Sequence, residues 1–368
     1  MQKIRLIPLV LSFILLVGCI QTKVLDDIEL IMAIGYDWNA DNKTYTGTAI
    51  APIFGASEDN ADMGKNVQYT GEAKTFQEIN ARIQTQAPFT IEVGNLADIL
   101  FGEALAKEGV SDILEGINED PSIGRDLNLA VVSGNAEDLL KNAPILELTL
   151  SRFIEKLIKN NNKNNIPRMN LHDFNYRLAG EGMDPFLPII QYSNTSVDII
   201  GLALMKHDQF VDQLPIDQFF IFSLLYEDSK DHTYEFYWDE EKQAVSIGSI
   251  YSKHSIDWKS DNEVEIQVAI YGTLAESNQI GMQSATEKQR LEQAVSKDLE
   301  QKGKELTKFL QQLDIDPLMI GDSASNHFRD WDKEEWKKQY PKITITPNID
   351  FNLEFSNIKK RPGQRSNY

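Results

Sequence analysis

The C-terminal part of the chain reads Ile-Thr-Ile-Thr-Pro-Asn-Ile-Asp-Phe-Asn-Leu-Glu-Phe over residues 343–355. Apolar and polar residues alternate, which predicts a long final strand over 342–355 with one face on a core and one face in water. Pro347 occupies an apolar position of this series and has no backbone N–H, which favours an edge strand or a bulge there. The stretch therefore predicts a sheet with one solvated face.

The segments that precede this strand alternate between strand and helix patterns. Residues 264–270 alternate in polarity and predict a half-buried strand, whereas residues 284–314 carry Leu and Val at helical spacing and predict the longest helix. Asp316 and Pro317 end that helix. A short amphipathic helix is expected over 330–340 with Trp331 and Trp336 on it. Five helical positions separate the two indoles by about 140°, so we expect one in the core and the other at a domain or subunit contact. The alternative is that both lie in the core.

The first half of the chain predicts an N-terminal α/β domain over residues 19–192. Buried strands are expected over 30–37, 45–52 and 127–133, a strand or short helix over 96–101, and helices from 76, 111, 146 and 171, with Thr75 and Asn170 as N-caps. The Asn-rich stretch 159–165 is expected to be a turn, and residues 199–214 a hairpin with His207 and Asp208 at its turn. Pro and Gly residues then interrupt the pattern, and the polar stretch 193–196 predicts a linker. This order of elements predicts an α+β fold, in which helices pack on mixed β-sheets.

Composition excludes several classes of protein. The 368 residues include 36 Lys and Arg against 56 Asp and Glu, a net charge of −20, which disfavours a nucleic-acid binder. The only strongly basic stretch is at the end of the chain, with Lys359, Lys360, Arg361 and Arg365. A single cysteine, Cys19, rules out a disulfide framework and any multi-cysteine metal site.

The N-terminus predicts an export signal and a lipid anchor. Lys3 and Arg5 precede twelve uncharged residues, 6–17, too few for a bilayer that needs about 20 apolar residues. The boundary Leu16-Val17-Gly18-Cys19 resembles the lipobox of bacterial lipoproteins, which implies cleavage after residue 18 and a diacylglyceryl lipid on Cys19. The alternative is a plain signal peptide with an incidental cysteine.

No motif for catalysis, a metal or a dissociable cofactor is recognisable. No two of the five histidines are three or four residues apart, and Walker A, dinucleotide-binding and nucleophile-elbow sequences are missing. Paired carboxylates such as Asp26 and Asp27 are expected on the surface. We therefore expect no enzymatic activity and no metal, and the covalent lipid as the only attached group.

Several short motifs, by their order and spacing along the chain, resemble those of the Ger(x)C family of spore germination lipoproteins, the C subunits of germinant receptors. The residues that carry the resemblance, besides the lipobox, are Asp26, Glu29, Gly35, Asp37, Gly201, Asp316, Pro317, Trp331 and Trp336. The chain departs from the family pattern at Leu25 and Ile28, where Trp and Arg are usual nearby, and at Met205, where Phe is frequent.

The resemblance implies an elongated ectodomain of three domains, which we place at 19–192, 196–258 and 259–362. It also implies A-type and B-type membrane subunits as partners and a position on the outer face of the spore inner membrane. The main alternative is a solute-binding lipoprotein of an ABC importer, which would consist of two repeated α/β lobes. A lipidated hydrolase is a more distant alternative.

Overall fold

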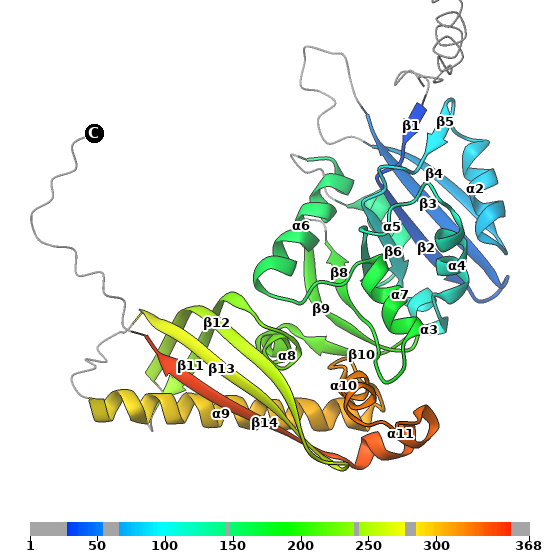
Figure 1. The fold of residues 1–368 in the computed structure, drawn as a ribbon. Helices are drawn as coiled ribbons and strands as arrows, with labels where there is room; N and C mark the ends of the chain where they lie inside the picture. The colour runs from blue at the N-terminus through cyan, green and yellow to red at the C-terminus, as the bar shows by residue number, and fades with distance from the viewer. Residues whose placement is uncertain are drawn as a thin grey trace, which may run out of the picture.

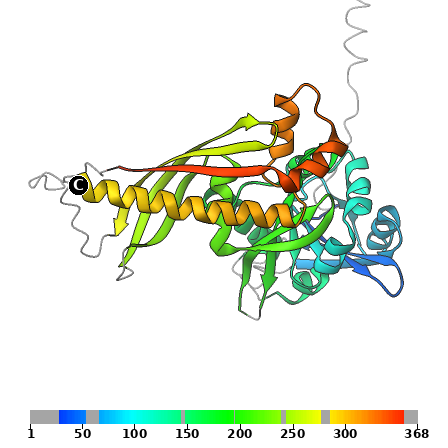
Figure 2. The same ribbon diagram turned by 90° about the horizontal axis from the view of Figure 1, so that it is seen from below.

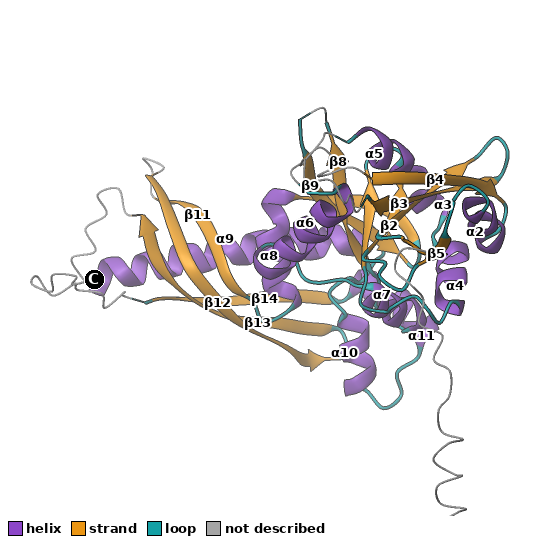
Figure 3. Ribbon diagram, turned by 90° about the horizontal axis from the view of Figure 1, so that it is seen from above, coloured by secondary structure: helices purple, strands orange, loops and turns teal. Residues whose placement is uncertain are grey.

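The computed structural model describes residues 28–53, 66–143, 148–193, 195–238, 243–276 and 285–354. The predicted lipobox, Leu16 to Cys19, and Asp26 lie outside the described residues. Two units, each built on one large sheet, lie end to end and give the protein an elongated shape (Figures 1 and 3).

The larger unit is built on an eight-stranded mixed sheet in the order β10-β9-β8-β7-β6-β2-β3-β4. Strands β2, β6, β7 and β8 run parallel in its centre, and antiparallel pairs flank them. Every residue of β6 and β7 is buried, as expected where helices cover both faces of a parallel sheet. The strands are β2 (Ala33–Asn39), β3 (Thr44–Pro52), β4 (Asn66–Ala73), β6 (Asp98–Gly102), β7 (Asn128–Val132), β8 (Phe186–Tyr192), β9 (Val197–Lys206) and β10 (Gln209–Pro215).

Six helices and a small additional sheet complete this unit among the residues described. The helices are α2 (Phe76–Gln84), α3 (Glu103–Glu108), α4 (Ser111–Glu119), α5 (Ala136–Asn142), α6 (Leu150–Asn164) and α7 (Leu171–Ala179). Strand β1 (Ile28–Leu30) pairs in parallel with β5 (Thr90–Glu92). Thr75 caps α2 as its sequence predicts, and Asn170 forms a reciprocal capping box with Asp173 at the start of α7.

The smaller unit is a four-stranded sheet in the order β11-β12-β13-β14, packed on the long helix α9 (Ala285–Gln312) (Figure 2). Its strands are β11 (Lys230–Trp238), β12 (Gln243–Ser260), β13 (Glu263–Glu276) and β14 (Thr344–Leu353). Pro347 does lie on an edge strand, β14, which runs parallel to β13. The other helices are η3 (Ile216–Gln218), α8 (Phe219–Tyr226), α10 (Ile320–His327), α11 (Lys333–Gln339) and η4 (Tyr340–Lys342).

The sheets do not respect the domain boundaries expected from the sequence. Strands β8 and β9 pair on either side of the expected linker 193–196, where the Ser193 N–H donates to the Ser196 carbonyl at 2.8 Å. The boundary at 258/259 falls inside β12, which pairs with β13 along most of its length. A separate middle domain was therefore a wrong prediction, because a tight turn and a linker use the same Ser and Asn residues.

Two local expectations also need correction. Helix α6 continues through the Asn-rich stretch expected to be a turn, since the Asn161 amide donates to the Leu157 carbonyl at 2.9 Å within the helix. Helix α11 begins only at Lys333, with Asp332 as its N-cap, so Trp331 precedes it. The angular separation expected of Trp331 and Trp336 on one helix therefore does not apply. None of the described helices is long and apolar enough to cross a membrane.

Candidate functional site

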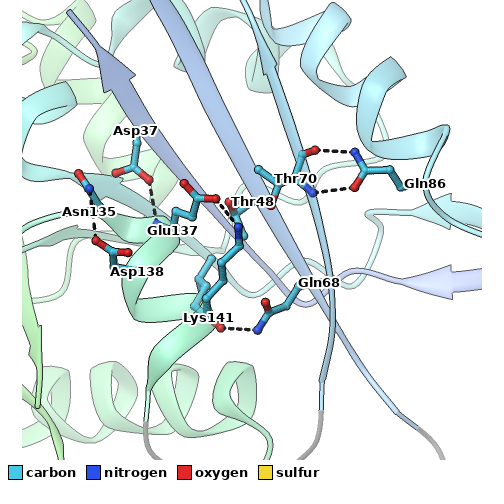
Figure 4. A network of polar contacts seen from close by, with 10 residues as sticks. Asp37, Thr48, Gln68, Thr70, Gln86, Asn135, Glu137, Asp138 and Lys141 are labelled. Carbon is cyan, nitrogen blue, oxygen red and sulfur yellow. Dashed lines mark hydrogen bonds and ion pairs between the residues drawn. The ribbon is translucent and has the colours of Figure 1, made fainter. Parts of the chain in front are cut away.

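Asp37, at the end of β2, supplies the N-terminal cap of a helix far away in the sequence. Its two carboxylate oxygens accept from the backbone N–H groups of Ala136 and Glu137, each at 2.8 Å. Figure 4 shows the bond to Glu137. Asn135, at the N-cap position of α5 itself, makes no side-chain cap bond. Burial raises the pKa of Asp37 to about 6, although the two amides oppose that rise. Asp37 is therefore a structural cap for α5.

Gly35 lets α5 approach the sheet beside this cap. A Cβ on Gly35 would lie 2.7 Å from the Cβ of Ala136 and 3.0 Å from Cδ1 of Leu140. Of the other motif residues in this unit, Glu29 lies in β1 and hydrogen bonds Tyr69, whose pKa rises to about 12 mainly through burial. Gly201 lies in β9 under the side chain of Gln213, whose amide donates to the Ile200 carbonyl at 3.2 Å.

The two units meet at a pair of aspartates, Asp184 and Asp316. The Asp316 N–H donates to the Asp184 carboxylate at 2.8 Å, and the Asp184 N–H donates to the Asp316 carbonyl at 2.9 Å. The second oxygen of Asp184 accepts from the His207 N–H at 2.8 Å, so the β9–β10 turn joins the same contact. This reciprocal pair ties the end of β9 and the loop before β8 to the α9–α10 loop.

Asp316 also caps α10. Its carboxylate accepts from the N–H groups of Ile320 at 3.0 Å and Gly321 at 2.7 Å. Burial raises the pKa of Asp316 to about 7, and the nearby Asp184 adds to the rise. Asp316 and Pro317, predicted as a helix stop and as motif residues, thus form part of the joint between the units.

Arg177 of α7 is the buried cation of this junction. Its guanidinium donates to the carbonyls of Asp184 at 2.8 Å and Pro317 at 3.1 Å, and to the Tyr226 hydroxyl at 2.7 Å. It also lies over the rings of Phe186 and Tyr226, 5.4 and 5.1 Å from their centroids. One side chain therefore contacts the larger unit, the α9–α10 loop and α8 at once.

A cleft of about 320 Å³ opens above this junction. The lysines on its rim are already paired: Lys206 with Asp314 at 2.7 Å, Lys333 with Glu181 at 3.5 Å, and Lys337 with Glu334 at 3.0 Å. No cluster of three or more potential metal ligands occurs among the described residues. The residues around this cleft therefore form a joint that fixes the two units relative to each other. The polar groups of the joint are paired with other groups of the same chain.

Trp336 forms the floor of this region, and Trp331 lies at its margin. Trp336 is buried, with Trp258 in a T-shaped contact at 6.1 Å and Tyr340 at 5.7 Å. Trp331 is partly buried against the core, and its indole N–H is enclosed without a hydrogen-bond partner among the described residues. The two tryptophans thus differ in environment.

The junction unites only part of the predicted motif set. Asp316, Pro317 and Trp336 come together, whereas Gly35 and Asp37 belong to the α5 contact and Gly201 to the edge of the large sheet. Sequence reasoning missed Arg177 and Asp184. The one signal for Arg177 was its place in the last turn of a capped helix; Asp184 had no signal beyond its neighbour Pro185.

Comparisons with known proteins find two family regions, which divide the chain between β8 and β9, inside the large sheet. Residues 21–192 match the family described as spore germination protein N-terminal domain, and residues 200–356 match the family described as spore germination B3/GerAC like, C-terminal. The chain is 27% identical over 356 residues to spore germination protein GerQC of Bacillus cereus, covering 95% of this chain and 98% of that one. It is 25% identical to YfkR of Bacillus subtilis (strain 168) over 221 residues, 56% of each chain.

The crystal structure of the GerBC protein has the same fold, with a TM-score of 0.53 at 16% identity over 87% of this chain and 96% of that one. The expectation of an importer's solute-binding protein is not supported, because the two units have sheets of different topology and are not repeated lobes. Both family matches and the fold agree with the resemblance seen in the sequence. The chain belongs to the Ger(x)C family of spore germination proteins, the C subunits of germinant receptors.

Proposed function

We propose that this protein acts in a nutrient-germinant receptor by holding A-type and B-type membrane subunits through protein contacts. It neither catalyses a reaction nor captures a germinant by itself. The observation that carries the proposal is that two spore germination families together match nearly the whole chain. Family membership points to a non-enzymatic role, and the internally paired groups at the junction agree with it.

The proposal includes a lipid anchor at Cys19, on the outer face of the spore inner membrane. Two acyl chains on this residue would hold the protein at a membrane without help from its charge. Cys19→Ala should leave the folded units intact and leave the precursor uncut at this position. Mass spectrometry of the native protein tests this: a mature N-terminus without a diacylglyceryl group would contradict the anchor.

Co-purification tests the receptor role. Spore inner membranes are solubilised in mild detergent, and the tagged chain is expected to retain two multi-spanning subunits. Calorimetry of the chain separated from its membrane subunits, with amino acids, sugars and nucleosides, is expected to give no saturable heat. Binding of any of these at micromolar concentration would overturn the proposal that the chain does not capture germinants.

A further inference from the structure

The eight-stranded and four-stranded sheets have four outer edges, on β4, β10, β14 and β11. Side chains or a bulge protect the first three of these edges against pairing with another strand. On β4, the Gln86 side chain bonds both the N–H and the carbonyl of Thr70, at 3.2 and 2.5 Å, as a neighbouring strand would (Figure 4). On β10, a bulge between Phe210 and Asp212 interrupts the register, and Asp212 accepts from the N–H of Gln213 at 2.7 Å. Such devices prevent unwanted strand pairing.

Helix α9 closes the third edge, that of β14. The backbone N–H groups of Ile349, Phe351 and Leu353 donate to side chains of α9 at 3.4, 3.0 and 2.8 Å. Their acceptors are Glu300, Ser296 and Glu292, spaced four residues apart on the helix. Four helical residues rise about 6 Å, nearly the distance between alternate strand residues.

The fourth edge, β11, has no such cover among the described residues. Along residues 230–238 the backbone makes no hydrogen bond to any described residue beyond its pairing with β12. Two register shifts interrupt β11 between Lys230 and Tyr234, but residues 234–238 are in regular register with 247–243. This second half of the strand is therefore the part that is straight enough to accept another strand. An open edge of this kind can bind an extended peptide through its main chain.

A groove of about 720 Å³ lies beside this open edge, between β11, α8, η3 and α9. Its apolar lining includes Ile216, which is 54% exposed, and the partly buried Phe220 and Phe309. Phe220 stacks on Tyr234 of β11 at 4.9 Å, so the apolar lining continues up to the edge strand. An extended segment on β11 could therefore place alternate side chains in the groove.

The groove is acidic. Asp217, Glu235 and Glu305 lie on it. Glu235 accepts from the Tyr237 hydroxyl and Glu305 from the Gln301 amide at 2.7 Å, but none of the three acids forms an ion pair with a residue in the described ranges. The lysine of the groove, Lys302, is already paired with Asp298 at 3.0 Å and donates to the Tyr234 hydroxyl at 2.6 Å. A partner segment that carries Lys or Arg would therefore complement the negative charge of the groove.

We infer that the β11 edge and its groove are a docking site for an extended, basic segment of a membrane subunit of the receptor, with its apolar residues in the groove. The segment would add a strand to the smaller sheet and place cations on Glu235, Asp217 or Glu305. This inference rests on the proposed function, since it names the surface through which the partner subunits are held.

The test uses the full-length chain purified from spore membranes with its partners. Glu235→Lys with Glu305→Lys should weaken retention of the membrane subunits at least tenfold, and Glu263→Lys, an exposed acid at the far end of β13, is the matched control. Melting temperatures show whether each variant is folded. In a second measurement, a thiol crosslinker on Thr233→Cys in the groove should reach a membrane subunit at a segment with Lys or Arg, whereas Ser255→Cys on the open sheet face should not.

The outcomes separate the two levels of the hypothesis. If the wild-type chain retains the subunits and the charge-reversed variant retains them equally well, the docking site is wrong and the receptor role stands. A Thr233→Cys crosslink to a segment without basic residues also overturns the docking site. If the wild-type chain retains no membrane subunit, the proposed function fails and the docking site fails with it.

Discussion

Gly182 and Gly321 contact each other backbone to backbone across the junction of the two units. A Cβ on Gly321 would lie 2.5 Å from the Cα of Gly182, and a Cβ on Gly182 would lie 2.7 Å from the Cα of Gly321. The Asp322 N–H donates to the Gly182 carbonyl at 3.1 Å, and Gly182 has a φ of +67°, which glycine adopts without strain. Only glycine at both positions allows the units to approach so closely.

Gly321→Ala should therefore loosen the junction. The added methyl group would meet the backbone of Gly182 and, at 2.4 Å, the indole nitrogen of Trp336. We expect a loss of about 1–3 kcal/mol in the free energy of unfolding by urea, as for other overpacked sites. Gly124→Ala is the control, because nothing lies within 4 Å of its Cβ position. Equal effects of the two substitutions would contradict the close contact.

Asp37→Ala should destabilise helix α5, because two buried amides would lose their acceptor. The expected loss is about 1–2 kcal/mol, the usual range for a helix cap. Asn135→Ala is the matched control, since Asn135 occupies the N-cap position without a side-chain cap bond. Urea unfolding at pH 7 compares them, and a larger loss for Asn135→Ala would refute the long-range cap.

This cap illustrates what the sequence can and cannot predict. Local patterns predicted β2, β3, β7, the β9–β10 hairpin and the capped helices α2 and α7, because each depends on residues within one element or its turn. The cap of α5 comes from a residue 99 positions before Ala136, and only the folded sheet brings the two together. Asn135 occupies the N-cap position and Asn is a common N-cap residue, yet its side chain makes no cap bond and Asp37 supplies the cap instead.

The final strand, β14, also shows that local sequence patterns do not predict long-range contacts. Its alternation and Pro347 predicted an edge strand, and β14 is one. The sequence did not predict that Glu292, Ser296 and Glu300 of α9 would cover its edge, because that match requires the relative position of helix and strand. The expected boundary at 258/259 failed for a similar reason, since the pairing of β12 with β13 is a long-range property, whereas the expected boundary after residue 192 coincides with the end of the N-terminal family match.

The free energy of unfolding should depend on pH in the range where Asp98 titrates. Its carboxylate accepts from the Asn128 amide at 2.7 Å, while its second oxygen is buried without a partner among the described residues. Burial raises the pKa of Asp98 from its ordinary 3.8 to about 7. The folded state therefore holds this proton more tightly than the unfolded chain, and the contribution to stability is present below about pH 4 and is lost as the pH rises through 7.

Asp98→Asn tests this dependence, because the amide oxygen can still accept from Asn128 but does not titrate. The free energy of unfolding of the variant should fall less steeply between pH 4.5 and pH 7.5, by at most about 1.4 kcal/mol per pH unit. Urea titrations across this range provide the slopes. The exposed Asp41→Asn serves as control, and parallel slopes for wild type and Asp98→Asn would rule out titration of Asp98 as their source.

Trp336 and Trp331 should respond differently to substitution because their surroundings differ. Trp336 is 5% exposed and packs among Trp258, Tyr340 and Gly321, so Trp336→Ala should cost about 3–5 kcal/mol. Trp331 is only partly buried, and its N–H has no partner among the described residues. Trp331→Phe removes that unpaired donor and should therefore be neutral or stabilising. Urea unfolding of both variants, and of Trp336→Phe as the matched change, measures the loss in the free energy of unfolding. If Trp331→Phe lowers this free energy as much as Trp336→Phe does, the two indoles support the fold equally and the prediction is wrong.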